Sequence, residues 1–439
     1  MLDRAKIIQY LRDFQEAPPQ KLIKRELAFP DTKKIISIIG PRRSGKTFLF
    51  FQTIQSIVEK GIEKERIVYL NFEDTKLAGV KYTEVDDILK LQWELYPKTI
   101  GKEIYIFFDE PQNIPSWEKA IRSLHDRNIG RLFITGSSAK LLSKEIATNL
   151  RGRTLSYILL PFSFKEFLSF KEFSIQNFPN FSSTEEAKLK SLLREYLKYG
   201  GFPEVVSEAE ESVKLKILKE YQDLALYRDI VERHGIKNLF IVKTLINMLF
   251  SGFSKEMSVN SIFNSIKSQG IKLSKKTLYN YVTYIEDAIA VFFVKKISAS
   301  AKVKEFSIPK AYLVDTGFAN LVSSFSENIG RIMENAVLLE LKRKQSLSPL
   351  AEIFYWKSQY GKEVDFAVKD RNRVKELIQV SYSIEGKKTK EREVNALLSA
   401  SKDIKNRNLT VITWDYEARE KHEGKTINFV SLWKWLLSD

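Results

Sequence analysis

The chain has 439 residues, of which 44% are hydrophobic and 29% are charged, and its formal net charge is +16. A chain of this length exceeds one ordinary hydrophobic core, so we expect two to four folded domains. It contains no cysteine and three histidines, which excludes disulfides, thiolate metal sites and cysteine nucleophiles and disfavours a zinc site.

The location and the partners of the chain also follow from its composition. No apolar stretch approaches the ~18 residues that span a bilayer, and the first residues lack the apolar core of a signal peptide. We therefore expect a cytoplasmic protein with no membrane partner. The positive charge favours a polyanion such as nucleic acid, because neutralising phosphates releases counterions. The alternative is a lysine-rich surface that only keeps the protein soluble.

The most specific motif lies near the N-terminus. Residues 40–47, Gly-Pro-Arg-Arg-Ser-Gly-Lys-Thr, match the phosphate-binding pattern G-x-x-x-x-G-K-[ST], after the apolar run Ile35–Ile39 and before an apolar stretch. In such a loop the lysine reaches the β and γ oxygens, and the threonine offers a hydroxyl to Mg²⁺. The alternative is a glycine-rich turn without a ligand. We predict that ATP is bound by Gly40, Pro41, Arg42, Arg43, Ser44, Gly45, Lys46, Thr47 and Phe48.

Two predicted strands follow, Ile67–Asp74 and Glu103–Glu110, and both are apolar runs that end in acidic residues. The second places Asp109 and Glu110 at the carboxyl end of a strand. In a P-loop fold this position brings the aspartate near Mg²⁺ and lets the glutamate polarise the attacking water. We predict Asp109 as a metal ligand and Glu110 as a catalytic residue.

A third predicted strand, Arg131–Ser138, ends in hydroxyl side chains. We predict that Ser137 senses the γ-phosphate; the alternative is a serine-rich turn or helix cap. Further along, Arg151 or Arg153 is predicted to donate to the γ-phosphate of a neighbouring subunit, which would make hydrolysis depend on assembly. The alternative for these arginines is simple solvation.

Taken together, the motifs resemble those of archaeal and bacterial AAA-type ATPases that carry a C-terminal domain of nuclease-like fold. The resemblance covers nearly the whole chain and rests on Leu22-Ile-Lys-Arg-Glu-Leu, the residues 40–47, Asn71-Phe-Glu-Asp, Asp109-Glu-Pro-Gln-Asn-Ile, Trp117-Glu, Thr135-Gly-Ser-Ser, Tyr199-Gly-Gly-Phe-Pro-Glu and Leu313-Val-Asp-Thr-Gly. It implies an α/β fold: a P-loop AAA-type core with a parallel sheet at 1–160, a helical lid at 161–240, a winged-helix module at 241–300 and a restriction-endonuclease-like domain at 301–439.

In the middle of the chain, apolar residues recur at helical spacing from Pro161 to about Phe240, as expected for a lid. Gly200-Gly-Phe-Pro interrupts the pattern and predicts a tight turn, with a hinge as the alternative. Three further helical patterns and the extended run Ala290–Val294 match a helix-turn-helix with a wing. In its predicted recognition helix, the candidates for contact with phosphates or bases are Lys275, Lys276, Tyr279 and Asn280. The alternative is a protein-contact module.

The C-terminal part carries most of a nuclease signature. Restriction-type nucleases use a glutamate on a helix, an aspartate in a hairpin and a Glu-x-Lys strand, because two carboxylates hold Mg²⁺ while the lysine positions water. Here Glu334 and Asp365 fit the first two positions, but Gln379 stands at the second carboxylate position and Ser381 at the lysine position. We predict a degenerate site kept for DNA binding or assembly; the alternative is that Lys362 or a nearby lysine replaces the missing one.

Three functions fit these features. The leading hypothesis is a cytoplasmic AAA-type ATPase that assembles as a homo-oligomer, for example a hexameric ring. It would use ATP and Mg²⁺ to remodel or move along duplex or branched DNA, as in branch migration. The alternatives are a nucleotide-controlled assembly switch with slow hydrolysis and an ATP-regulated DNA nuclease.

Overall fold

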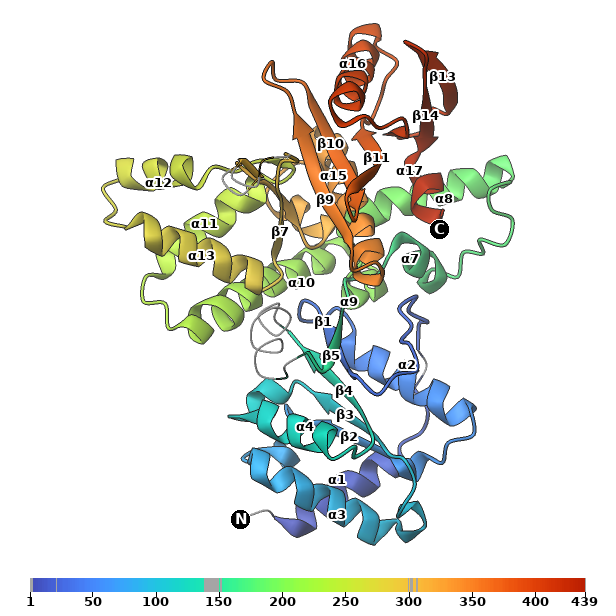
Figure 1. The fold of residues 1–439 in the computed structure, drawn as a ribbon, viewed down its shortest axis with the longest axis vertical. Helices are drawn as coiled ribbons and strands as arrows, with labels where there is room; N and C mark the ends of the chain where they lie inside the picture. The colour runs from blue at the N-terminus through green and yellow to red at the C-terminus, as the bar shows by residue number, and fades with distance from the viewer. Residues whose placement is uncertain are drawn as a thin grey trace. The chain divides into compact units, whose positions relative to one another are not determined.

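The computed structural model describes residues 3–20, 22–137, 150, 152–298, 300, 303–304 and 307–438 (Figure 1). The chain divides into two compact units, Met1–Leu159 and Leu160–Asp439, which we call unit 1 and unit 2. Within the described ranges, no helix is both long enough and apolar enough to cross a membrane.

Unit 1 is built on a five-stranded parallel sheet with the strand order β2-β3-β4-β1-β5 (Figure 1). From α1 to β4 its helices and strands alternate along the chain, as expected when parallel neighbours are joined by crossover helices. In chain order they are α1 (Arg4–Glu16), β1 (Ile35–Ile39), α2 (Lys46–Glu59), β2 (Ile67–Asn71), α3 (Val85–Leu95), β3 (Tyr105–Asp109), α4 (Trp117–Asp126), β4 (Arg131–Gly136) and β5 (Thr154–Ile158).

The central strands of this sheet are buried on both faces, which explains their continuous apolar runs. One face forms a hydrophobic cluster with α2, in which Ile36 of β1 and Phe107 of β3 pack with Leu49 and Phe50 of the helix. Phe50 contacts Phe107 edge-on, and Phe107 stacks on Phe133 of β4 with ring centroids 4.5 Å apart. This packing holds α2, and with it the loop that precedes α2, against the sheet.

Strand order decides which residues meet at the carboxyl edge of the sheet. Strand β4 lies between β1 and β3, so the residues that follow these strands are brought side by side. The loop at 40–45 follows β1, Asp109 ends β3, and Thr135 is near the end of β4. Three segments far apart in sequence therefore converge on one edge.

Unit 2 begins with a helical region. Its helices are α7 (Phe164–Phe170), α8 (Ser183–Tyr199), α9 (Pro203–Ser207), α10 (Glu211–Leu224) with π-helical turns after it (Ala225–Glu232), α11 (Leu239–Ser251), α12 (Val259–Ser268) and α13 (Lys275–Asp287). A small antiparallel sheet follows in the order β6-β8-β7, formed by β6 (Lys255–Glu256), β7 (Val291–Val294) and β8 (Lys310–Leu313). Its middle strand thus comes from beyond residue 300.

A six-stranded sheet with the order β13-β14-β12-β11-β10-β9 forms the C-terminal part of unit 2 (Figure 1). Strands β9 to β11 form an antiparallel meander, and α16 leads from β11 to the parallel strand β12. One face packs on α16 through Val394, Leu397 and Leu398. The elements are α15 (Phe325–Leu347), β9 (Ala351–Lys357), β10 (Glu363–Asp370), β11 (Arg373–Val380), α16 (Lys387–Ile404), β12 (Leu409–Thr413), β13 (Ala418–His422), β14 (Lys425–Ser431) and α17 (Leu432–Leu437).

Two glycine-containing motifs of unit 2 interlock around a buried carboxylate. Asp315 accepts hydrogen bonds from the backbone N–H groups of Gly201 and Gly317, both at 2.8 Å. Burial raises the pKa of Asp315 to about 6, in opposition to these two donors. Gly200 has a φ of +79°, and a Cβ there would lie 1.6 Å from Asp315 Oδ1. This close approach fits the predicted tight turn at Gly200, which the contact with Asp315 holds in place.

We expect Gly200→Ala to lower the free energy of unfolding of unit 2 by about 2 kcal/mol or more, because the new Cβ overpacks a buried site in addition to straining the backbone. The matched control is Gly361→Ala, where φ is +80° and no atom lies within 4 Å of an added Cβ. In the control the free energy of unfolding should fall by only about 1–2 kcal/mol, because backbone strain alone is added. Urea unfolding of both variants measures the difference, and equal losses would contradict the role of the contact with Asp315.

Candidate nucleotide site

The loop that joins β1 to α2 has the backbone of a phosphate cradle. Gly45 adopts a left-handed conformation with φ +93° directly before the first turn of α2. A Cβ on Gly40 would lie 2.0 Å from the carbonyl oxygen of Leu159, so only glycine fits there. The loop thus turns tightly onto the N-terminus of a 14-residue helix, whose free N–H groups and dipole favour an anion.

The side chains of the loop are buried and directed inward. Lys46 is 6% exposed, and its ammonium group donates to the carbonyl oxygens of Gly40 and Pro41, both at 3.2 Å. Among the described residues, the buried Ser44 hydroxyl has no hydrogen-bond partner. A buried cation and an unpartnered hydroxyl in one loop fit the phosphate oxygens of a nucleotide, which would supply acceptors for both.

Asp109 accepts hydrogen bonds from hydroxyl groups on three other elements. Thr47 of α2 and Tyr69 of β2 donate to Oδ2 at 2.7 and 2.8 Å, and Thr135 of β4 donates to Oδ1. The carboxylate is 2% exposed. Thr47 and Asp109 therefore face each other, as they must if both are to hold one Mg²⁺ ion, and their oxygen donors suit that ion.

Glu110 lies next to the same group. Its backbone has a φ of +51°, and its N–H donates to the Thr135 hydroxyl at 2.9 Å. Its carboxylate lies 3.3 Å from the Lys46 ammonium and accepts a hydrogen bond from Gln112. Burial would raise the pKa of Glu110, but the charge of Lys46 and then the Gln112 bond hold it below its usual value. Glu110 is therefore an ionised base, suited to polarising water.

Three residues of this site were not assigned a role from the sequence. Thr135 and Tyr69 bind Asp109, and the buried Arg25 guanidinium donates to the carbonyl of Ser44 at 2.7 Å. Arg25 belongs to the segment Leu22–Leu27, which contributed to the family resemblance but was given no role of its own. Thr135 and Tyr69 carry hydroxyl groups inside otherwise apolar strands, and this pattern could have identified them as residues of the site.

The remaining predicted residues of unit 1 differ in burial and in their contacts, and the charge of Arg42 also lowers the pKa of Glu110. Ser137 is buried, at 1% exposed, whereas Phe48 is 56% exposed. Arg42 pairs with Glu73 at 3.4 Å. Arg43 is exposed and adopts a left-handed conformation, with φ +65°.

Arg151 or Arg153 was predicted to donate to the γ-phosphate of a neighbouring subunit, and the structure describes Arg153. Arg153 precedes β5 at the amino end of the sheet, where its guanidinium binds Asp126 at 2.7 and 3.1 Å. Arg151 lies outside the described residues.

The predicted residues of unit 2 fall into two groups. The candidate DNA contacts are all exposed on α13, whose N-cap is Ser274; they are Lys275, Lys276, Tyr279 and Asn280. The nuclease-like residues Glu334, Asp365 and Gln379 come together in the interior, and Lys310 lies among them. Lys362, which was expected as a replacement lysine, instead donates to Ser399 at the surface.

Three family models match consecutive segments of the chain: an AAA domain at residues 32–168 and two domains of unknown function, DUF8612 at 190–328 and DUF4143 at 329–435. The chain is 41% identical over 435 residues to an uncharacterized protein of Methanocaldococcus jannaschii, a match that covers 98% of this chain and 94% of that protein. It is 30% identical over 415 residues to an uncharacterized protein of Haemophilus influenzae, covering 94% and 97%. The chain belongs to the family of these two proteins.

Solved structures add little to this assignment. AMPPCP-bound DnaA from Aquifex aeolicus is 13% identical and matches 64% of this chain and 85% of its own, with a TM-score of 0.23. Cdc6p from Pyrobaculum aerophilum is 11% identical and matches 78% and 93%, with a TM-score of 0.26. Scores this low carry no argument about this chain.

The segment that matches the AAA domain contains most of the site described above. Its matched residues, 32–168, include the loop at 40–47, Asp109, Glu110 and Thr135. Unit 1 is therefore an AAA-type ATPase domain, and Lys46, Thr47, Asp109 and Glu110 lie close together within it.

We expect Thr135→Val to lower kcat for ATP hydrolysis by about tenfold or more with little loss of ATP affinity, because the hydroxyl orients the general base rather than the phosphates. Valine keeps the shape but removes the bonds to Asp109 and from Glu110 N–H. Ser137→Ala serves as the comparison. Steady-state hydrolysis and binding of a fluorescent ATP analogue measure the two effects. A larger loss of kcat in Ser137→Ala than in Thr135→Val would restore Ser137 as the principal sensor.

Proposed function

We propose that this protein is an oligomeric ATPase that binds DNA through α12 and α13 and uses ATP hydrolysis to remodel or move along duplex or branched DNA. The observation that carries the proposal is that one chain holds an AAA nucleotide site and a lysine-bearing segment, residues 257–285, without acidic residues.

The proposed hydrolysis assigns a task to each group of the site. The N–H groups of the loop and Lys46 would hold the phosphates, while Thr47 and Asp109 would hold Mg²⁺, which neutralises phosphate charge. Glu110 would orient the attacking water and draw on its proton. Thr135 would fix the positions of Asp109 and Glu110 relative to each other, because it forms hydrogen bonds with both. Arg25 would fix the loop from behind through Ser44.

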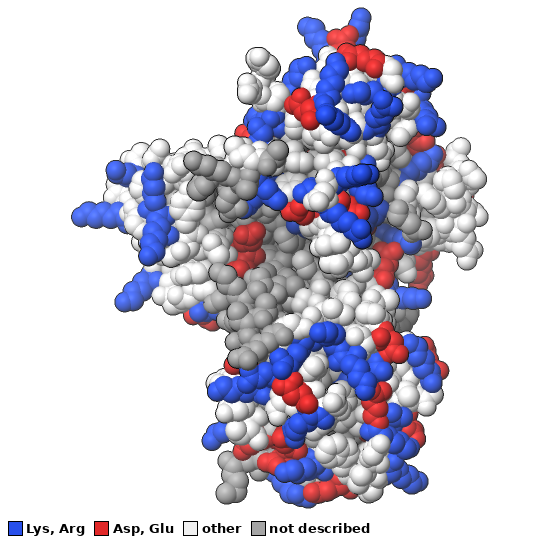
Figure 2. All heavy atoms as spheres, viewed as in Figure 1, with Lys and Arg blue, Asp and Glu red and all other residues white. Residues whose placement is uncertain are grey.

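The proposed DNA surface is defined by its charge. Residues 257–285 contain no aspartate or glutamate, and they carry the lysines Lys267, Lys272, Lys275 and Lys276. In Figure 2 blue spheres stand among white ones at the outer end of the part that holds α12 and α13. These lysines attract phosphate backbones, and the segment contains no carboxylate that would repel them. This charge supports nucleic acid as the partner.

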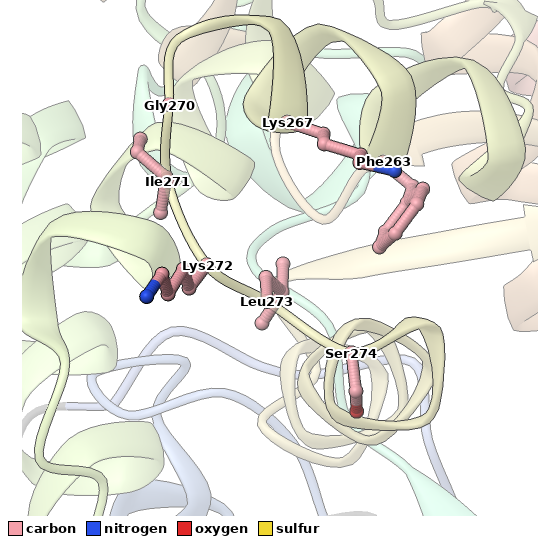
Figure 3. Close-up of a pocket in the computed structure, with 7 residues that line it drawn as sticks. All are labelled: Phe263, Lys267, Gly270, Ile271, Lys272, Leu273 and Ser274. Atoms are coloured by element: carbon pink, nitrogen blue, oxygen red, sulfur yellow. The ribbon is translucent and has the colours of Figure 1, made fainter.

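The same two helices border an open hollow of about 650 Å³ at the turn between them (Figure 3). Lys267 comes from the end of α12, and Lys272 and Ser274 come from the turn before α13. Phe263, Ile271 and Leu273 add apolar side chains to the lining. The two lysines would contribute positive charge beside these apolar side chains, which supports contact with a nucleic acid backbone.

The order of elements supports the two domain types proposed for unit 2. Helix α11, strand β6, helices α12 and α13 and the pair β7 and β8 follow the order of a winged helix, in which the second helix of the turn motif would enter the major groove. The helix α15, the meander β9 to β11, the helix α16 and the parallel strand β12 follow the order of a restriction-endonuclease-like core.

An oligomer would let a neighbouring subunit complete the nucleotide site with an arginine. Arg153 is bound to Asp126 of its own chain, so Arg151 would take this role first. Assembly would then make hydrolysis depend on subunit contacts.

We expect ATP hydrolysis at low salt to be stimulated by one form of DNA and abolished by Glu110→Gln, while ATP binding persists, because the amide cannot accept a proton from water. Steady-state assays without DNA and with single-stranded, duplex and four-way-junction DNA test this. Turnover that is slow and indifferent to every DNA form would contradict the motor and favour a nucleotide-controlled assembly switch.

The double variant Lys275→Glu/Lys276→Glu should weaken DNA binding and lower the slope of log affinity against log salt by about two, because each lysine neutralises about one phosphate. The matched control is Lys387→Glu/Lys388→Glu, an exposed pair in the first turn of α16. Fluorescence anisotropy over a salt series measures both variants. An equal weakening in the control would show that total charge, rather than α13, determines affinity.

A further inference from the structure

Lys310 is an almost fully buried lysine at the centre of a cluster of carboxylates. It lies on β8, and its side chain is 2% exposed. Its ammonium group is 3.0 Å from Glu334 Oε1 on α15, 3.0 Å from Asp365 Oδ1 on β10 and 2.7 Å from Glu363 Oε1. One cation therefore occupies the space that these carboxylates share.

The oxygens that a metal ion would need are already engaged. Glu334 Oε1 also accepts from the Tyr312 hydroxyl at 2.6 Å, and Asp365 Oδ2 accepts from Val380 N–H at 3.0 Å. Gln379 stands where a nuclease has its second carboxylate, but its carbonyl oxygen accepts from Asp365 N–H and its amide donates to Glu393. Mg²⁺ and Mn²⁺ require several free oxygen ligands in near-octahedral geometry.

The described residues as a whole agree with this local picture. Within the described ranges, no group of three or more histidine, cysteine, aspartate or glutamate side chains is arranged to hold a metal ion. Burying carboxylates is costly unless each is paired and hydrogen-bonded, and here Lys310 provides the pairing. With the Lys310 ammonium between them, Glu334 and Asp365 do not fit the metal that a restriction-endonuclease-like fold implies.

We propose that Lys310 takes the place of the divalent cation in this cluster, so that the C-terminal domain holds Glu334 and Asp365 with an internal ammonium ion. The comparison with a metal centre depends on the nuclease-like fold proposed above; the ion cluster itself does not. Because β8 pairs with β6 and β7, the same ion ties the small sheet to α15 and β10. The cluster then has a structural role, holding β8 against α15 and β10, and no role in cutting DNA.

The first test keeps Lys310 in place and contains no nucleotide. Bound Mn²⁺ is counted by electron paramagnetic resonance for the wild type and for Asp365→Asn. We expect the two to bind the same amount, because Lys310 excludes the metal. Mn²⁺ that binds to the wild type and is lost in Asp365→Asn would overturn the proposal, and this comparison holds whether or not a Lys310 variant folds.

The second test removes the ammonium ion. Lys310→Met should bind one more Mn²⁺ per chain than the wild type, at least about tenfold more tightly than any wild-type binding, since two buried carboxylates then lack a cation. Mn²⁺ should also raise its Tm, and Lys310→Met/Asp365→Asn should lose both effects. The matched control is Lys357→Met, which removes a neighbouring lysine bound to Glu256 and Glu363 and should gain no Mn²⁺.

A folded Lys310→Met chain that gains no Mn²⁺ would refute the proposal. The result is separable from that of the proposed DNA motor, because neither ATP nor DNA enters the measurement. A chain whose turnover ignores DNA would still show the predicted Mn²⁺ pattern if Lys310 holds the cation position.

Discussion

Asp109 accepts hydrogen bonds from hydroxyls on α2, β2 and β4, and this shared acceptor fixes how those elements meet at the carboxyl edge of the sheet. A buried carboxylate without donors would be costly, so the site is stable only when all of these elements are in place. The Thr135 hydroxyl extends the network to the N–H group of Glu110. One set of hydrogen bonds thus positions Asp109, Glu110 and Thr47, the proposed metal ligands and catalytic base.

The same principle recurs in unit 2 with different chemistry. Asp315 joins two glycine motifs by accepting from backbone N–H groups, and Lys310 joins β8 to α15 and β10 by donating to carboxylates. In both places a buried charged group is satisfied by partners from segments distant in sequence. Such contacts specify one arrangement of elements more strongly than apolar packing alone, since any other arrangement leaves a charge unpaired.

The features that local sequence determines were predictable. The phosphate loop, the strand that ends at Asp109 and the helix that follows the loop all arise from short runs of apolar residues next to a motif. The contact between Thr135 and Asp109 was not predictable in this way, because it depends on β4 lying next to β3 in the sheet. Lys310 is 24 residues from Glu334 and 55 from Asp365 in sequence, whereas the nearby Lys362 points to Ser399. Proximity along the chain was therefore a poor guide to the cation of that site.

The position of Lys310 also bears on how unit 2 comes apart. Local opening of the small sheet would separate β8 from α15 and β10 and expose several buried charges at once, at a cost far above that of fraying one strand. The small sheet and the core of the C-terminal sheet are thereby bound into one cooperative unit. Their amide protons should exchange with solvent together, with a common protection that exceeds that of the helices α12 and α13.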